Sequence, residues 1–141
     1  MYQKSTSTTN MLQVADEFLA TAQTIPQNTN AAGDEGFKEI SGTLGALDVV
    51  FSAKTAVTLA SNTTFTAHLE DSADGVNSIA DVPGASLTKS AGATGAIYAA
   101  GTILARIPVP STAKRYVRCN IATNDAAATG TIDAFVEFKG R

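Results

Sequence analysis

The chain is poor in the side chains that carry most enzyme chemistry. Its 141 residues include one histidine, one cysteine and no tryptophan. A single cysteine excludes an intramolecular disulfide, so the fold does not depend on an oxidising compartment. A single histidine leaves few arrangements in which an imidazole base activates a nucleophile. We therefore expect a non-enzymatic protein with no catalytic, cofactor or metal site.

Charge and long apolar runs are also scarce. Charged residues make up 16% of the chain, and the net charge is -3. A nucleic-acid-binding domain would take its affinity from clustered Lys and Arg, and a membrane helix needs roughly 20 apolar residues in a row. The N-terminal stretch lacks the form of a signal peptide, because Asp16 and Glu17 interrupt its only apolar run. We expect synthesis in a cytoplasm and neither nucleic acid nor membrane as a partner.

Alternating patterns are abundant instead. From residue 48 onward, segments such as "DVVFSA", "TFTAHLEDS", "RYVRCNIAT" and "TGTIDAFVEF" place apolar and polar side chains in turn. Seven or eight short strands with turn residues between them, and no helical pattern among them, predict an all-β fold, an antiparallel β-sandwich or jelly roll. The side chains expected to be buried are Val49, Phe51, Ala53, Val57, Leu59, Phe65, Ala67, Leu69, Ile103, Ala105, Ile107, Val109, Val117, Cys119, Ile121, Ile132, Ala134, Val136 and Phe138.

The first third of the chain is less regular. The Ser/Thr/Asn-rich start predicts a flexible, extended N-terminal arm over residues 1–12, and residues 13–141 then form a single jelly-roll domain, best defined over 48–141. Residues 11–25 fit either an amphipathic helix or an extended segment, and both remain open. Residues 26–48 predict a long loop or a loosely paired edge, and the Gly-rich residues 89–102 a loop.

Three groups of residues are candidates for chemistry. His68 lies on the polar side of its strand, where we expect an exposed histidine, and Cys119 lies on the apolar side, where we expect a buried, unreactive thiol. Glu70, Asp71 and Asp74 cluster at a strand end. Their segment "EDSADG" is too short for an EF-hand loop and predicts a solvated turn.

The one basic cluster consists of Lys114, Arg115 and Arg118. Three interpretations are open. The charges protect an edge strand from unwanted pairing, contact an acidic protein partner at the rim of an interface, or bind phosphate.

Several of these segments together resemble a known family. "FTAHLEDSADG", a Gly/Ala-rich middle, "ILARIPVPSTAKRYVRCNIAT" and "GTIDAFVEFKG", within residues 57–141, are similar to the cement or decoration proteins of tailed bacteriophages, typified by the Bordetella phage cement protein. The resemblance implies a jelly roll that binds the outside of the icosahedral capsid as a homodimer or homotrimer and bridges neighbouring major capsid proteins. Asp74-Gly75, Arg115, Tyr116 and Arg118 match the family pattern. We expect Tyr116 to pack and hydrogen-bond, and Arg118 to pair with a carboxylate.

If the resemblance holds, the protein belongs on the exterior of the virion capsid. The candidate contacts to the capsid or a sister subunit are Tyr2, Lys4, Lys114, Arg115 and Arg118. The alternative is a carbohydrate- or receptor-binding sandwich of a tail or surface protein. It is less favoured because sugar sites usually present exposed aromatic rings, and the chain has no Trp and three Tyr.

Overall fold

The computed structural model describes residues 18–40 and 47–138, which form strands joined by turns and loops. The strands are β1 (Phe18–Thr24), β2 (Asn30–Ala32), β3 (Lys38–Glu39), β4 (Leu47–Ala53), β5 (Val57–Leu59), β6 (Thr64–Ser72), β7 (Ala80–Ser90), β8 (Ala96–Tyr98), β9 (Ile103–Pro108), β10 (Tyr116–Thr123) and β11 (Thr131–Phe138). The predicted all-β class is confirmed.

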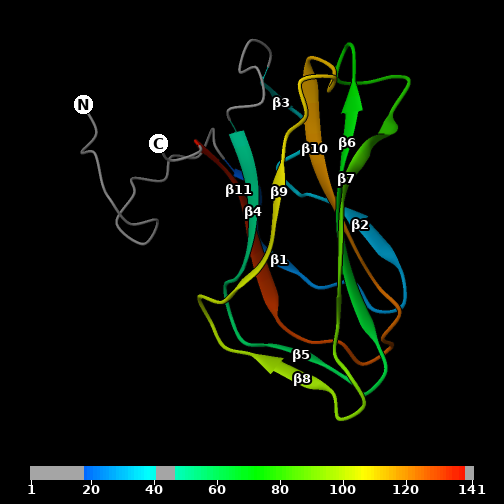
Figure 1. Cartoon of the computed structure of the whole chain (residues 1–141), viewed down its shortest axis with the longest axis vertical. Helices are drawn as coiled ribbons and strands as arrows, with labels where there is room; N and C mark the ends of the chain where they lie inside the picture. The colour runs from blue at the N-terminus through cyan, green and yellow to red at the C-terminus, as the bar shows by residue number, and fades with distance from the viewer. Residues whose placement is uncertain (1–17, 41–46, 139–141) are drawn as a thin grey trace, which may run out of the picture.

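Two sheets face each other. The β4 sheet has the order β1-β11-β4-β9, and the β6 sheet has the order β2-β10-β6-β7, with β3 also pairing to β10. Figure 1 shows them as two layers, with the small β5–β8 ribbon across one end. If β2 and β3 count as one interrupted strand and the ribbon is set aside, the strands in chain order form sheets 1-8-3-6 and 2-7-4-5. This is the order of a jelly roll, and every pairing is antiparallel.

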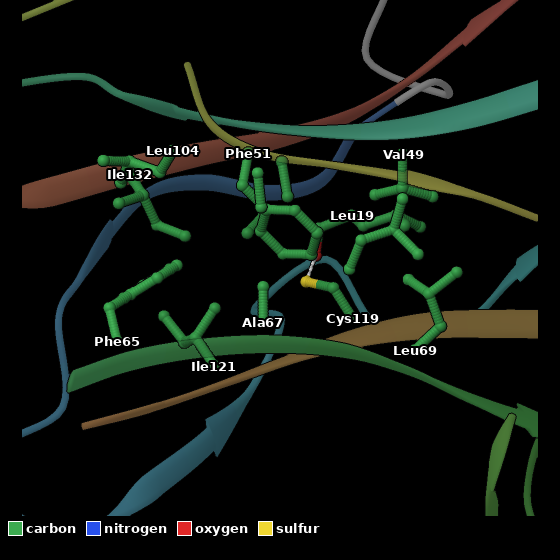
Figure 2. Close-up of a cluster of buried hydrophobic side chains, with 14 of the residues drawn as sticks. Leu19, Val49, Phe51, Phe65, Ala67, Leu69, Leu104, Cys119, Ile121 and Ile132 are labelled. Carbon is green, nitrogen blue, oxygen red and sulfur yellow. Dashed lines mark hydrogen bonds between the residues drawn. The ribbon is translucent and has the colours of Figure 1, made fainter. Parts of the chain in front are cut away.

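The core lies between the two sheets. Figure 2 shows Val49, Phe51, Leu104 and Ile132 of the β4 sheet meeting side chains of the β6 sheet. The β6-sheet side chains that the figure labels are Phe65, Ala67, Leu69, Cys119 and Ile121. The nine side chains named here are all buried, and the alternation in the sequence predicted this for each of them except Leu104. Each sheet thus turns one apolar face inward.

Strand β4 is buried on both of its faces. Val50 lies on the outer face yet is fully buried, and its cross-strand neighbour Phe135 is also buried. The ring of Phe18 packs on Phe135 with 5.8 Å between centroids. An interior strand covered on both sides has consecutive apolar residues, as at Val49-Val50-Phe51 in β4.

The predicted burial is wrong for Ile103 of β9 and holds only in part for Val136 of β11. Ile103 is 41% exposed, whereas Leu104 is buried. The ladder between β4 and β9 advances by one residue from Phe51 to Ser52 but by two on β9, so β9 carries a bulge that changes which side chain points inward. Val136 is only partly buried, and the side chain of Phe138 lies outside the described part of the chain.

Two strands were not predicted. β7 falls largely in the Gly/Ala-rich middle of the chain, where no alternating pattern predicted a strand, and β8 falls inside the predicted loop 89–102. In β7 the buried side chains are Val82 and Ala85, three residues apart. The β6–β7 ladder advances by two residues from His68 to Glu70 but by five on β7, so an irregularity removes the two-residue period that marks a strand.

The structure decides between the alternatives for residues 18–25 and 26–40. Residues 18–24 form strand β1, so the extended alternative holds there. β2 and β3 both pair with β10, which makes residues 30–39 the loosely paired edge that the sequence left open. The predicted arm 1–12, with Tyr2 and Lys4, lies outside the described residues.

Candidate interaction surfaces

Three of the candidate polar side chains, His68, Glu70 and Arg118, meet Asp81 and Asn120 on the outer face of the β6 sheet. The antiparallel register sets Arg118 of β10 opposite Glu70 of β6, and Glu70 opposite Asp81 of β7. One step along the same face, Asn120 of β10 lies opposite His68 of β6. Side chains directly opposite each other in a sheet are near enough to interact, so the fold brings these five into one group.

Arg118 pairs with a carboxylate, as predicted. Its Nε donates to Oε1 of Glu70 at 2.7 Å, and the guanidinium lies 4.8 Å from the centroid of the Phe37 ring. Both side chains of the ion pair are at least three-quarters buried, so solvent screens the pair less than an exposed one. These contacts hold Arg118 within the sheet surface, where it orients Glu70.

Arg115 and Lys114 lie at the start of β10 and are exposed. Nη2 of Arg115 lies 3.1 Å from Oε1 of Glu39, and its guanidinium is 5.6 Å from the Tyr116 ring. The hydrogen bond to Glu39 raises the pKa of Arg115 above its ordinary value. The ammonium of Lys114 forms no ion pair with any described residue, while its backbone N–H donates to Asp71.

The interpretation of the basic cluster as edge protection is wrong. β10 is an interior strand, paired with β6 on one side and with β2 and β3 on the other. A joint phosphate site is also disfavoured, because Arg115 and Arg118 each already pair with a carboxylate. Of the three interpretations, a rim contact to an acidic partner through Lys114 and Arg115 is the one compatible with this geometry.

His68 is half-buried rather than exposed. Its side chain is 21% exposed, and Nε2 lies 3.4 Å from Oδ1 of Asp81 and 3.9 Å from Oε2 of Glu70. Asp81 belongs to none of the motifs in the sequence. It comes next to His68 only through the irregular β6–β7 ladder, for which the sequence of β7 offers no periodic pattern.

Cys119 is fully buried, as predicted. Its Sγ faces the carbonyl oxygen of Leu19 at 3.8 Å. Burial raises the pKa of the thiol to about 12, which removes the reactive thiolate at neutral pH.

The three carboxylates of "EDSADG" do not share one site. Glu70 lies on the outer face, and Asp71 is buried and accepts a hydrogen bond from the Lys114 backbone, so a solvated turn describes only Asp74. Asp74 accepts backbone hydrogen bonds from Val76 at 2.9 Å and from Asn77 at 2.7 Å. Its carboxylate shapes the turn between β6 and β7.

The Asp74 turn also contacts β10. A side-chain carbon placed on Gly75 would lie 3.3 Å from the Tyr116 ring, so the ring packs closely on the turn backbone. Gly75 has a φ of 78°, which glycine adopts without strain. The residues that carry the family resemblance therefore form one packed unit of turn and strand.

Asp74 makes stability depend on pH. The N–H groups of Asn77 and Val76 lower its pKa well below the ordinary value. A carboxyl with a depressed folded-state pKa stabilises the fold above its unfolded-state pKa, about 3.9, and that contribution is lost as pH falls below this value.

We expect Asp74→Asn to lower Tm by a few degrees at pH 7. The gap in Tm between the variant and the unmutated protein should narrow below about pH 4. Thermal melts followed by circular dichroism between pH 7 and pH 3 measure the gap. Glu35→Gln, an exposed carboxylate change, is the control, and a gap independent of pH would contradict the assignment.

The large apolar side chains exposed in the described chain all belong to one consecutive stretch. They are Val76, Ile79, Leu87, Ile97 and Ile103, each between 40% and 74% exposed. These residues lie on β7, β8, β9 and the connection that leads into β7. Within the described residues, β7 pairs only with β6 and β9 only with β4. We call these two open edges and their connecting segments the β7–β9 side.

Comparison of the chain with protein-family models and with curated proteins finds no match. A search of residues 18–40 and 47–138 for a helix of membrane-spanning length and hydropathy also found none.

Proposed function

We propose that the chain is a structural head protein of a tailed bacteriophage. It binds the outside of the assembled capsid as a homo-oligomer, bridges neighbouring major capsid proteins and thereby stabilises the shell. It is made in the host cytoplasm and ends on the exterior of the virion.

The observation that carries this proposal is the β7–β9 side. The large apolar side chains exposed in the described chain all come from residues 76–103, and β7 and β9 are sheet edges whose outer backbone groups have no strand partner among the described residues. Isolated exposed apolar residues are ordinary on a surface, but their restriction to one segment of the described chain favours a protein-docking surface. Open strand edges favour the same role, because they offer backbone donors and acceptors to another chain.

The family resemblance supports the proposal from the sequence. The residues that carry it include Glu70 of β6, the turn Asp74-Gly75, and Tyr116 and Arg118 of β10. Arg118 pairs with Glu70, and the Tyr116 ring packs on Gly75. Such residues define the scaffold. The surface that recognises the shell then lies elsewhere, which leaves the β7–β9 side and the Lys114–Arg115 rim as the candidate contacts.

Bridging works through several weak contacts at once. A shell filled with DNA fails first at the junctions between its capsomers, and a small protein that touches both sides of a junction adds buried area there. Linking two or three copies makes the second contact intramolecular, so avidity multiplies modest individual affinities.

A pelleting assay tests the proposal. We expect the purified protein to sediment with expanded heads that lack it, at a fixed and saturable ratio to major capsid protein. Ile97→Asp and Ile103→Asp should each weaken attachment about tenfold or more, because a buried unpaired carboxylate opposes an apolar contact. Thr29→Asp is the matched control, since it adds the same charge next to β2, at the opposite edge of the β6 sheet.

The outcomes separate two claims. Protein that is folded but stays in the supernatant would rule out the capsid role, and a glycan-binding screen would then examine the alternative of a sugar-binding sandwich. Attachment that all three variants retain would keep the role and rule out the β7–β9 side as the contact.

A further inference from the structure

We propose that His68, Glu70 and Asp81 form a binding site for a divalent cation of the zinc class on the outer face of the β6 sheet. This site is independent of the capsid role. It also departs from the sequence-based expectation of no metal site, because Asp81 joins the other two residues only in the folded sheet.

The three side chains already lie near the spacing of metal ligands. One ligand atom from each lies within 4.8 Å of the others. Nε2 of His68 is 3.4 Å from Asp81 Oδ1 and 3.9 Å from Glu70 Oε2. Two ligands bound tetrahedrally to Zn²⁺ at about 2.0–2.1 Å are about 3.3 Å apart. Small side-chain movements therefore bring all three onto one ion.

The backbone and a neighbouring ion pair preorganise the site. His68 and Glu70 are two residues apart on β6 and so share a face, and Asp81 lies directly across from Glu70 on β7. Arg118 occupies Oε1 of Glu70, which leaves Oε2 on the side of His68. Hydrogen-bonded carboxylate ligands of this kind are a common feature of metal sites, because the outer partner fixes the ligand's orientation.

A buried polar group with an unsatisfied atom lies beside the cluster. Asn120 is 5% exposed and lies opposite His68 in the β6–β10 ladder. Its Nδ2 is 3.5 Å from Oε1 of Glu70, whereas its Oδ1 is buried and has no hydrogen-bond partner among the described residues. A buried carbonyl oxygen without a donor is unfavourable. The amide that contacts Glu70, one of the three proposed ligands, thus carries an unsatisfied oxygen beside the cluster.

The donor set selects the class of metal. An imidazole nitrogen combined with carboxylate oxygens suits Zn²⁺ and its first-row neighbours, whereas Ca²⁺ and Mg²⁺ prefer oxygen ligands throughout. Glu70, Asp81 and Arg118, with a neutral His68, carry one net negative charge, so a divalent cation reduces the repulsion between the two carboxylates.

The single histidine of the chain makes the test direct. The full-length protein, treated with a chelator and dialysed, is titrated with ZnCl₂ while the imidazole signals of His68 are followed by NMR. We expect a saturable shift at one ion per chain, and no comparable shift with MgCl₂ or CaCl₂. Competition with a chromophoric chelator then gives the affinities of the variants. Asp81→Asn should weaken Zn²⁺ binding by at least tenfold, and His68→Gln by at least as much.

Matched variants keep the result interpretable. Asp81 has a side chain 77% exposed, so its replacement leaves the core untouched, and circular dichroism verifies the fold of each variant. Glu35→Gln removes an exposed carboxylate away from the cluster and should leave the affinity unchanged. The proposal is overturned if the His68 signals do not respond to Zn²⁺, or if Asp81→Asn, His68→Gln and Glu35→Gln bind it equally well. In the second case the ion binds elsewhere, and His68 is only an ion-pair partner of the two carboxylates.

Discussion

Replacing Phe51 with alanine is expected to lower the free energy of unfolding by about 3–5 kcal/mol. Phe51 is fully buried and extends from the interior strand β4 into the space between the sheets, toward Ala67 and Cys119 (Figure 2). Neighbours as small as these leave the ring to fill much of the space between the layers. The cavity left by alanine then adds to the lost burial, because a close-packed sandwich relaxes only partly.

Urea denaturation of Phe51→Ala and of the unmutated protein measures this loss. Ile97→Ala is the control, because it also shortens an apolar side chain but at a position 74% exposed. We expect the control to change stability by less than about 0.5 kcal/mol. Equal losses for the two variants would contradict the placement of Phe51 in the core. A total stability of about 5–15 kcal/mol is usual for a domain, so the Phe51 variant should fold but melt much earlier.

The sequence predicted the strands whose ladders are regular. The ladders that join β10 to β6 and β11 to β4 contain no register shift, so inward and outward side chains on these strands alternate as written in the sequence. Phe65, Ala67 and Leu69 on β6 are therefore buried as expected. Alternation is a local property, and it suffices wherever one face of a strand is buried and the pairing is uniform.

The same reasoning fails where a ladder is irregular. β9 contains a bulge that turns Leu104 inward and Ile103 outward, and β7 contains an irregularity beside Gly84, whose φ is 77°. Both strands end a sheet, where bulges are common and where fewer side chains are buried. No property of the local sequence specifies how many residues such a bulge inserts.

The polar side chains on the outer face of the β6 sheet show how far a site can be predicted from the sequence. A carboxylate partner for Arg118 could be expected from chemistry alone, but its identity as Glu70 required the register of β10 on β6. Asp81 is further removed, because it reaches His68 only through the irregular half of the β6–β7 ladder. Pairing between distant segments is set by the whole topology, which residue spacing along the chain does not contain.

Gly33→Ala is expected to destabilise the protein by about 3 kcal/mol, at the upper end of the usual cost of overpacking. Gly33 lies just after β2, where its N–H donates to the carbonyl oxygen of Cys119 at 2.8 Å. A Cβ there would overlap the backbone carbonyl oxygen of Leu19 and lie 2.5 Å from Sγ of Cys119. The residue thus fits between β1 of one sheet and β10 of the other, near the sheet edges that β1 and β2 form.

Gly36→Ala separates the two possible causes of such a loss. Gly36 has a φ of 71° and open space around its missing Cβ, so alanine there meets only backbone strain, about 1 kcal/mol. Gly33 has the steric conflict without a left-handed φ. If crowding is the cause, the loss at Gly33 exceeds that at Gly36 in urea denaturation, although Gly→Ala alone favours folding by restricting the unfolded chain.

A double-mutant cycle with Cys119→Ala completes the argument. Removing Sγ relieves one of the two overlaps, so the cost of Gly33→Ala should be smaller by about 1 kcal/mol in the Cys119→Ala background than in the unmutated protein. The overlap with the Leu19 carbonyl oxygen remains, so rescue stays incomplete. Strict additivity of the two substitutions would mean that the alanine does not reach Cys119, and the close approach of β1, β2 and β10 at this point would then be wrong. A coupling between Gly33→Ala and Cys119→Ala would show that the missing side chain of Gly33 allows β1 and β10 to approach each other at this point.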